Sequence, residues 1–594
     1  MSSEPPASPS PPRPPDAGRE RVDGSGVTPR AATVVSAAAS GVDPRRAMRS
    51  AGIISLAIAC SRVLGLIREM ILAALFAGEN RKWLDCFNMA FRTPNMLRDL
   101  FAEGALSTAF VTVFSKKIAN EGDRPAWQLA CKMATLTAVF MSGVAIAGIV
   151  FAPFIIDWLA FGWRESAPEK IEFTVLLARI MFPFIALVSL AALVMGMLNA
   201  KDVFGIPAMA SSFFNLGSII GGGLLGWWID PTFGKNALIG FAFGTLIGGL
   251  CQLTIQFPAL RKVGFRYRRD LRWRDSGVTK ILQLMWPAVI AGSAVQVNVL
   301  LNSIFASFLV DGSVSWLSMA FRLMQLPLGI FGVAVATVTL PALARAAREG
   351  WSPDFNRQLA TGMRTVFALT LPAALGLSLL AEPIISVIFE RGRFDLTDRL
   401  MTAEALRFYA VGLLFYGGIK VVQPAFTAID RRFVPMYVSL ASILVNAGLN
   451  SWFVFGLGKN HAWLALSTGV VAAVNFFALV IILRHLVGTL HEWEFIRAAV
   501  RSMAAAAVMV VTCVIAQHTL LAGWDDYGQL IRILTLGAVI GVAGTLYLGL
   551  CHLWKVEEVS NYLGGVYRRF HRRRSTPPAT KSRGPKDPDW PDQI

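Results

Sequence analysis

Long apolar stretches recur along this chain from about Gly52 to Leu553, and they constrain its fold more than any other feature. A segment needs roughly 20 consecutive apolar residues to cross the hydrocarbon layer of a membrane. Such segments must be helical, because an open sheet edge would leave unpaired backbone groups in lipid. Charged residues make up only 16% of the chain, against about 25% in soluble domains. The sequence therefore predicts an all-α protein that crosses the membrane many times.

About fourteen transmembrane helices are predicted from these stretches. Their expected limits are 50–77, 84–115, 126–160, 171–198, 205–228, 236–260, 277–308, 314–344, 358–389, 398–427, 434–456, 461–483, 495–517 and 529–553. The first 49 residues are polar and rich in proline, and because such a composition cannot bury a core, we expect 1–49 to be a disordered tail. Residues 554–594 are expected to form a second, basic tail.

The distribution of Lys and Arg predicts the orientation. Loops on the side of the N-terminal tail carry more of these residues than the opposite loops, and both tails are basic. This bias predicts a multi-pass protein of the cytoplasmic membrane with both termini in the cytoplasm. The net charge of +18 lies largely in these segments, so we expect the basic loop 261–274 and the C-terminal tail to contact anionic lipids, and we expect no nucleic-acid partner. The six cysteines show no CxxC pairing, which argues against a disulfide framework or metal site.

A short repeat relates two halves of the chain. Residues 89–92 (Met-Ala-Phe-Arg) recur at 319–322, each time in the second expected span of a half. Six spans separate the two copies, and because six is even, the halves should have the same orientation. We therefore predict two six-helix lobes in parallel repeat, 50–260 and 277–483, with two further helices at 495–553.

Several charged residues lie inside these otherwise apolar spans. Inserting an arginine at the centre of a membrane helix costs roughly 2.5–3.5 kcal/mol on insertion scales, so such residues should face protein or water. A guanidinium group binds phosphate through two parallel hydrogen bonds, so a cavity lined by arginines would suit a diphosphate or another anion. The arginines that suggest such a cavity are Arg62, Arg92, Arg98 and Arg322. Helical spacing places Asp85, Arg92, Asp99 and Glu103 along one stripe of the second span.

A structural role is the alternative for each of these charges. Arg68 lies next to Glu69, and Arg98 lies next to Asp99, so each pair can neutralise itself within the membrane. Arg179, near the middle of the fourth span, can likewise serve as a donor between helices.

The same residues resemble the MurJ (MviN) family, the lipid II flippases of bacterial cell-wall synthesis. The matching stretches are 61–69, 85–110, 305–316, 322–324 and 389–392, within a similarity that covers about 50–555. The resemblance implies the fold of the multidrug/oligosaccharidyl-lipid/polysaccharide exporter superfamily. In that fold two six-helix lobes enclose a cationic cavity, and two C-terminal helices form a groove for the lipid tail.

The resemblance also implies roles for particular residues. The family's critical cavity arginines match Arg62, Arg68, Arg98 and Arg322, an acid that matters matches Asp85, and Arg92 matches a basic position. The substrate-binding residues that we predict are Arg62, Arg68, Asp85, Arg92, Arg98, Glu103 and Arg322. Some members bind sodium through acids, but the matching positions here hold Asn302 and Asn450, with Asn446 nearby. A sodium site is put in doubt, because a hard cation favours charged oxygen ligands, and only a remnant of one is predicted.

These observations predict a transporter and not an enzyme. The function that the resemblance implies is to flip lipid II, an undecaprenyl-diphosphate-linked disaccharide peptide, from the inner to the outer leaflet for cell-wall synthesis. We expect it to work by alternating access, as a single chain without a cofactor. An exporter of another polyprenyl-diphosphate glycolipid, or of a drug, would share the fold and is the first alternative. A membrane-embedded glycosyltransferase is a second, although the short loops offer little room for paired catalytic carboxylates. A scaffold without transport activity is a third.

Overall fold

The computed structural model describes residues 44–332, 339, 343, 353–431, 433–556 and 558–560, and these residues form helices and connections without a strand. The first half contains α2 (Pro44–Phe76), η1 (Gly78–Asn80), α3 (Arg81–Leu97), η2 (Arg98–Leu106), α4 (Ser107–Glu121), α5 (Asp123–Leu159), α6 (Trp163–Ser166), α7 (Pro168–Met181), α8 (Phe184–Asn199), α9 (Gly205–Ile229), α10 (Ala237–Thr254) and α11 (Phe257–Lys262). The second half contains α12 (Ser276–Ala306), α13 (Ser313–Pro327), η3 (Leu328–Gly332), α15 (Pro353–Leu379), α16 (Ala381–Phe389), α17 (Leu396–Ala428), α18 (Phe433–Ser451), η4 (Trp452–Gly456), α19 (His461–Val487), α20 (Glu492–His518), η5 (Trp524–Asp526) and α21 (Gln529–Leu553). The all-α prediction is confirmed.

Eleven helices among these residues are long and apolar enough to cross a membrane, so the predicted number of fourteen is not confirmed. The three expected spans that do not meet this criterion are 50–77, 84–115 and 277–308. The first two carry most of the predicted intramembrane charges, and the third is strongly apolar only over Val295–Ala306. The helix α2 begins at Pro44, six residues before the expected limit, because proline is favoured in the first turn of a helix. The rest of the two predicted tails lies outside the described residues, apart from the segment that follows α21.

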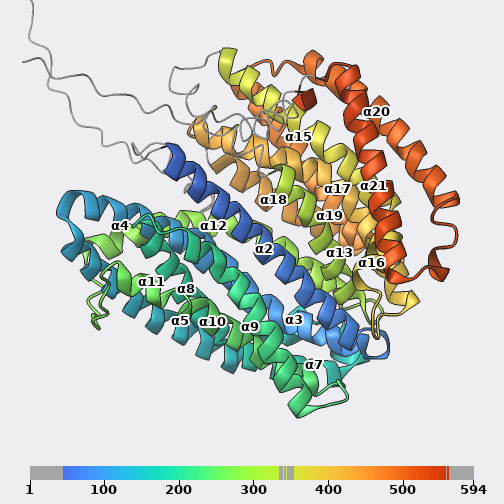
Figure 1. The fold of residues 1–594 in the computed structure, drawn as a ribbon. Coiled ribbons are helices and arrows are strands. Elements are labelled where there is room, and N and C mark those ends of the chain that lie inside the picture. Colours follow the sequence, from blue (N-terminus) through green and yellow to red (C-terminus); the bar gives the residue numbers. More distant parts are fainter. Residues whose placement is uncertain are drawn as a thin grey trace, which may run out of the picture.

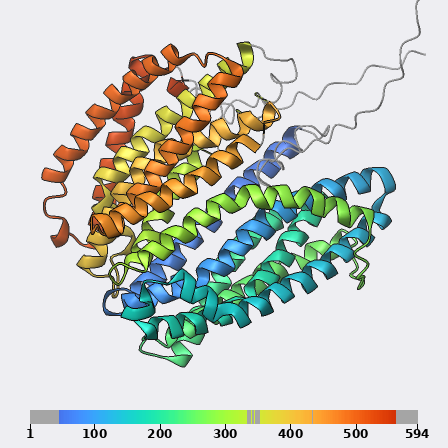
Figure 2. The same ribbon diagram turned by 180° about the vertical axis from the view of Figure 1, so that it is seen from behind.

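The helices gather into two bundles, one in blue to green and one in yellow to red (Figure 1). The helix α2 runs along α9 of the first bundle, whereas α12 packs against η2, α4 and α5 as well as against α18 and α19. Seen from behind, the bundles meet where α2 ends and diverge toward the start of α2 (Figure 2). The seventh predicted span therefore touches both bundles rather than one alone.

Small residues allow the closest helix contact of the first bundle, between α9 and α10. A Cβ atom on Gly240 would lie 2.2 Å from the backbone nitrogen of Gly226, and one on Gly244 would lie 2.4 Å from the Cα of Gly222. A larger residue would clash at these positions, so the contacts require glycine. Close packing of this kind is what holds membrane helices together, since exclusion from water does not drive their association. The helix α9 of this tightly packed pair also packs against α2.

The two bundles are joined at the end where α2 leads into α3, and we call this region the joined end. The backbone nitrogen of Arg393 donates to the Ala74 carbonyl at 2.8 Å, and Nη1 of Arg393 donates to the Phe233 carbonyl at 2.5 Å. The carboxylate of Asp398 accepts from the Gly78 nitrogen at 2.8 Å. These bonds join the first half to the first turn of α17 and to the connection that precedes it.

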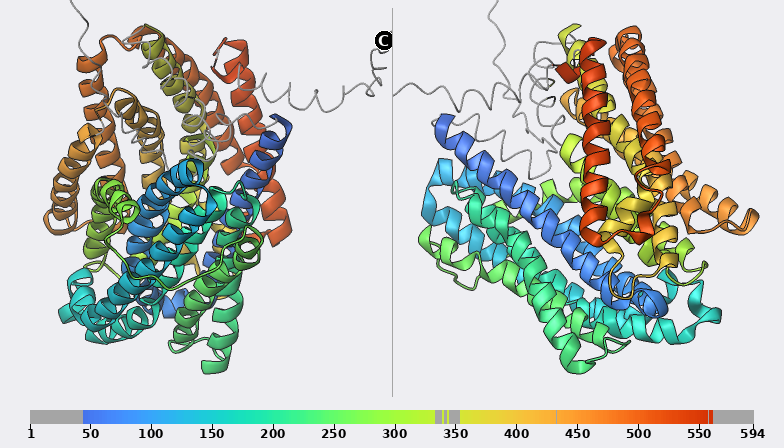
Figure 3. Two further views of the ribbon diagram at one scale, coloured as in Figure 1. Left: turned by 90° about the vertical axis from the view of Figure 1, so that its left-hand side faces the viewer. Right: turned by 45° about the vertical axis from the view of Figure 1, so that its right-hand side comes forward.

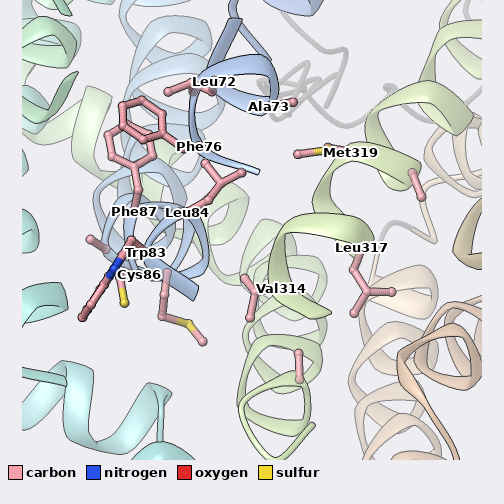
Figure 4. Packing of buried hydrophobic residues seen from close by; sticks show 14 of the residues in the cluster. Leu72, Ala73, Phe76, Trp83, Leu84, Cys86, Phe87, Val314, Leu317 and Met319 are labelled. Atoms are coloured by element: carbon pink, nitrogen blue, oxygen red, sulfur yellow. The ribbon is translucent and has the colours of Figure 1, made fainter. Parts of the chain in front are cut away.

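Apolar packing reinforces the joined end. One buried cluster contains Phe76 and Leu84 from the first half together with Val314 and Leu317 from α13, and Figure 4 shows these side chains around the junction. The cluster extends across both bundles, so separating them at this end would expose closely packed side chains. Interiors packed this densely resist gradual deformation and favour two discrete arrangements.

The last two long helices, α20 and α21, lie on the outer side of the second bundle (Figure 3). They pack against each other, and α20 also packs against α15 while α21 contacts α16. The buried Arg399 of α17 binds Asp525 at 2.6 Å and Glu390 at 3.2 Å, and Trp524 Nε1 donates to Ser386 Oγ at 3.0 Å. This polar cluster attaches the connection between α20 and α21 to the rest of the bundle.

Candidate functional site

A cavity of about 520 Å³ lies between the two halves, and residues of α2, α3, η2, α9, α10, α12 and α13 line it. Five of the seven predicted binding residues are among the described lining residues: Arg62, Arg68, Arg92, Arg98 and Arg322. Two carboxylates, Glu69 and Asp99, are also among the described lining residues, which together carry a net charge of +3. The arrangement suits an anion that carries more than one negative charge.

The first wall of the cavity is the charged face of α2. Arg62 and Glu69 are seven residues apart, which is about two helical turns and places them on the same face. Gly65 lies between them, and a Cβ atom there would be 3.6 Å from Nη1 of Arg322. The absence of a side chain at this position lets the arginine of α13 approach α2 closely.

Glu69 links two of the arginines across the halves. Its Oε1 atom lies 3.1 Å from Nη2 of Arg68 and 2.9 Å from Nη2 of Arg322. The Arg68 guanidinium also lies 5.3 Å from the ring centroid of Phe214 on α9, within cation–π range. The structural pairing of Arg68 with Glu69 is therefore present, and it extends to the opposite wall of the cavity.

The second wall includes a change of helix type at Arg98. The chain passes from α3, which contains Pro94, into the π-helix η2 that begins at Arg98. Arg98 Nη2 donates to Asp99 Oδ1 at 2.8 Å, and both residues line the cavity. The predicted stripe assumed 3.6 residues per turn, and that spacing ends where the π-helix begins. The Glu103 side chain, predicted for the same stripe, lies outside the described residues.

Asp85 lies elsewhere, since it is absent from the described lining of this cavity. It is buried, and its Oδ2 accepts from the Gly312 nitrogen at 2.7 Å. Its Oδ1 accepts from the Ser315 nitrogen at 2.9 Å and from Ser315 Oγ at 2.6 Å. Asp85 thus supplies from α3 the carboxylate that caps the start of α13. Its position makes it a connection between the halves at the joined end.

The three asparagines of the predicted sodium-site remnant lie together between α12, α18 and α19. Asn302 Oδ1 accepts from Asn446 Nδ2 at 3.2 Å and from Asn450 Nδ2 at 2.9 Å. Asn302 Nδ2 in turn donates to Thr468 Oγ1 at 2.9 Å. The amides therefore bind one another, and they present no carboxylate to a cation.

Uncharged polar residues of the cavity were not predicted. Asn215 of α9 lines it and donates from Nδ2 to the carbonyls of Ser61 at 3.1 Å and Ser211 at 3.2 Å. Gln296 of α12 and Gln325 of α13 line it as well. The sequence does contain a signal for such residues, namely an amide side chain in the middle of an apolar span. An amide that is buried in a membrane needs a hydrogen-bond partner.

The chain is similar to known proteins over most of its length. The profile of a family described as lipid II flippase MurJ matches residues 73–535. A protein of Vibrio cholerae serotype O1, named probable lipid II flippase MurJ, is 35% identical over 521 residues, which cover 86% of this chain and 97% of that protein.

Solved structures show the same similarity. A structure described as lipid II flippase MurJ in the inward closed conformation aligns with a TM-score of 0.66 and 25% identity, over 83% of this chain and 98% of that one. An inward-facing multidrug resistance MATE family transporter of the MOP superfamily aligns with a TM-score of 0.59 over 77% of this chain and 98% of that one. Because this identity is 15%, the second similarity concerns the fold alone.

Proposed function

The chain belongs to the MurJ lipid II flippase family, and we propose that it moves lipid II from the inner to the outer leaflet of the cytoplasmic membrane. It is a multi-pass membrane transporter and not an enzyme. The observation that carries the proposal is the cavity between the halves, with five arginines and two carboxylates. A guanidinium group recognises phosphate through paired hydrogen bonds, so this lining suits the diphosphate of the lipid headgroup.

The charge of the cavity argues against the nearest rival of the same fold. A cavity for a cationic drug should contain more carboxylates than arginines, and the lining here has the opposite balance. Another polyprenyl-diphosphate glycolipid would carry the same anion, so the sugar and peptide parts must provide any further selectivity. For a binding set we propose the five arginines of the lining together with Glu103, and we propose that Asp85 acts on binding from the joined end.

In our proposal the headgroup enters at the end where the bundles diverge. The loops at this end include the basic segment 261–274, whereas the joined end carries fewer Lys and Arg residues. The positive-inside bias then places the diverging end and both termini in the cytoplasm. The joined end faces outward in this arrangement and must open for release. One chain suffices, because a single chain supplies the cavity and the joined end.

Binding of a diphosphate would compete with Glu69 for Arg68 and Arg322. Both guanidinium groups now share this one carboxylate across the cavity. An anion between them would take over these hydrogen bonds and alter the contact between α2 and α13. We propose that this exchange couples headgroup binding to the relative movement of the two lobes, 50–260 and 277–483. The helices of 495–553 would hold the lipid tail, since their outward faces carry exposed apolar residues such as Val511 and Leu534.

We infer that the asparagine cluster holds no sodium ion in the transport cycle. Sodium would need oxygen ligands that point at a common centre, and the Asn302 oxygen already accepts two amide hydrogens. Neutral amides also provide no charge to offset dehydration of a hard cation. Transport in reconstituted vesicles should therefore be equally fast with sodium or potassium in the buffer. A requirement for sodium would contradict this inference.

The direct test of the function is rescue of a bacterium depleted of its own lipid II flippase. Arg62→Ala and Arg322→Ala should fail to support growth, because each removes charge-assisted hydrogen bonds worth about 1.5–3 kcal/mol. Arg179→Ala is the matched control, since Arg179 is exposed on α7 and is absent from the described lining of the cavity. Each variant should be measured at equal membrane abundance. Full rescue by both cavity variants would overturn the assignment of the site.

A further inference from the structure

A second cavity, of about 290 Å³, adjoins the arginine-lined one within the second half. Its lining comes mainly from α12, α13, α17, α18 and α19. The two cavities share a wall, because Arg92, Ser318 and Phe321 line both of them. A ligand that reaches Arg92 from the first cavity is thus in contact with the second.

The second cavity differs from the first in its chemistry. Among its described lining residues only Arg92 and Lys420 are charged, and neither Asp nor Glu is present. The rest of the polar lining consists of amides and hydroxyls, including Gln423, Ser439 and Asn475. The second cavity therefore offers one ammonium group among many neutral hydrogen-bonding groups. The first cavity, in contrast, contains a cluster of guanidinium groups.

Lys420 lines the cavity with an exposed side chain and has no hydrogen-bond or ion-pair partner among the described residues, although α17 is long and apolar enough to span a membrane. An ammonium group in such a place is expensive and usually marks a substrate pathway or binding site. Lysine acts as a compact point charge with three donors, whereas the planar guanidinium fork matches phosphate. A ligand that binds Lys420 should therefore carry a hydrogen-bond acceptor with one negative charge, such as a carboxylate.

Asn475 provides an independent indication of a ligand. Its Nδ2 donates to Ser439 Oγ at 3.4 Å, but its Oδ1 is buried without a hydrogen-bond partner in the described structure. The Nε of Arg92 is also buried without a partner there. Buried polar atoms are nearly always paired, so one buried unpaired acceptor and one buried unpaired donor at the same cavity point to a missing ligand. A peptide supplies both complements, an N–H group for Asn475 and a carboxylate for Lys420.

We propose that this second cavity is a subsite for a short peptide with a free carboxylate, and that Lys420 binds the carboxylate. The inference rests on the proposed function, in which the diphosphate of the same cargo occupies the arginine-lined cavity. The peptide part of a lipid-linked disaccharide peptide would then extend past Arg92 into the second half. The first cavity would recognise any polyprenyl diphosphate, and the second would select those that carry the peptide.

The test compares the binding of three lipids to the full chain in nanodiscs. All three have the same polyprenyl diphosphate and disaccharide: one carries the peptide with free carboxylates, one carries it with the carboxylates amidated, and one has no peptide. The native chain should bind the first lipid about 10-fold more tightly than the second, as expected for one charge-assisted hydrogen bond. Lys420→Gln should bind the first lipid about 10-fold more weakly than the native chain and should no longer distinguish it from the second.

Two further variants keep the test decisive. Lys420→Arg retains the charge and should retain the preference for the free carboxylate, whereas Lys280→Gln, an exposed lysine on α12, should behave as the native chain does. Equal binding of the first two lipids by the native chain would overturn the proposal, and so would a Lys420→Gln chain that still distinguishes them. Failure of the proposed function would look different, because the native chain would then bind none of the three lipids, or Arg322→Gln would leave their binding unchanged.

Discussion

Asp85 shows how a single buried carboxylate can hold two halves of a transporter together. It receives three hydrogen bonds from the turn that starts α13, two from backbone nitrogens and one from Ser315 Oγ. The N-terminus of a helix presents unpaired N–H groups and a partial positive charge, and a carboxylate satisfies both. Because Asp85 belongs to α3, this cap exists only while the halves are joined.

The first prediction concerns Asp85→Asn. The amide keeps one acceptor oxygen but turns the other into a donor, which faces the N–H groups that it should accept from. We expect the joined end to lose about 1–3 kcal/mol, the typical cost of leaving a buried donor unsatisfied. Thermal unfolding of the purified protein should shift down, while Asp526→Asn, at an exposed aspartate, should not shift it. Equal unfolding temperatures for the Asp85 variant and the native chain would contradict the role of the cap.

At the scale of elements, the attachment of α20 and α21 depends on the ionic cluster around Arg399. This side chain is 4% exposed and lies among Glu382, Glu390 and Asp525. The hydrogen bond from Arg399 holds the pKa of Asp525 below its usual range. The resulting stabilisation is complete above the ordinary aspartate pKa of about 3.9. It is lost only as the pH falls through the lowered pKa, so the attachment should not vary between neutral and mildly acidic pH.

The second prediction compares Arg399→Gln with Asp525→Asn. Removal of the buried arginine leaves two half-buried glutamates with less compensation, and loss of one partner from a buried pair is strongly destabilising. The Asp525 side chain is 70% exposed, so solvent screens its contribution and its loss should cost much less. Protease cleavage in the connection at 519–528 should increase more in the arginine variant. A larger effect of Asp525→Asn would show that the exposed acid, and not the arginine, secures the connection.

How far the sequence predicts an element depends on whether its signal is local. The spans expected at 205–228 and 236–260 correspond to α9 at Gly205–Ile229 and α10 at Ala237–Thr254, because an apolar run sets the length of a membrane helix. The transition to η2 was not predicted, since a fixed period of 3.6 residues cannot describe a π-helix. Its position near Pro94 was the only local hint.

The same distinction applies to the candidate site. Arg62 and Arg322 could be grouped from sequence, because a charge in an apolar span must face protein or water. The location of Asp85 could not, since it depends on the start of α13, more than 200 residues away in the chain. Lys420 was not predicted as a binding residue, because the cavity that it lines is formed by several helices that are far apart in the sequence.

At the scale of the whole molecule, the two bundles meet at one end and diverge at the other (Figure 2). The contacts at the joined end come from several separate connections. Gly78 and Gly312 both donate to buried aspartates of other helices, and the Arg393 side chain donates to three carbonyl groups of the first half. Breaking one such bond costs little compared with opening them all together. This collective character favours an end that is either closed or open, as alternating access requires.

The last prediction is that a covalent link across the joined end stops transport. Arg81 Nη2 and Asp395 Oδ2 lie 2.5 Å apart and connect the two halves, whereas Lys82 Nζ and Glu169 Oε1 lie 3.0 Å apart within the first half. Both pairs should be replaced by cysteines in a chain whose native cysteines have been removed. Each pair should be linked with a short bis-methanethiosulfonate, which forms a disulfide with each cysteine and releases methanesulfinate. We expect the link between positions 81 and 395 to abolish lipid transport in vesicles until a reducing agent cleaves it. The link between positions 82 and 169 should leave transport unchanged, because that pair moves with one bundle. Undiminished transport with the first pair fully linked would mean that the cargo crosses the membrane without opening of the joined end, and alternating access would then have to be abandoned for this chain.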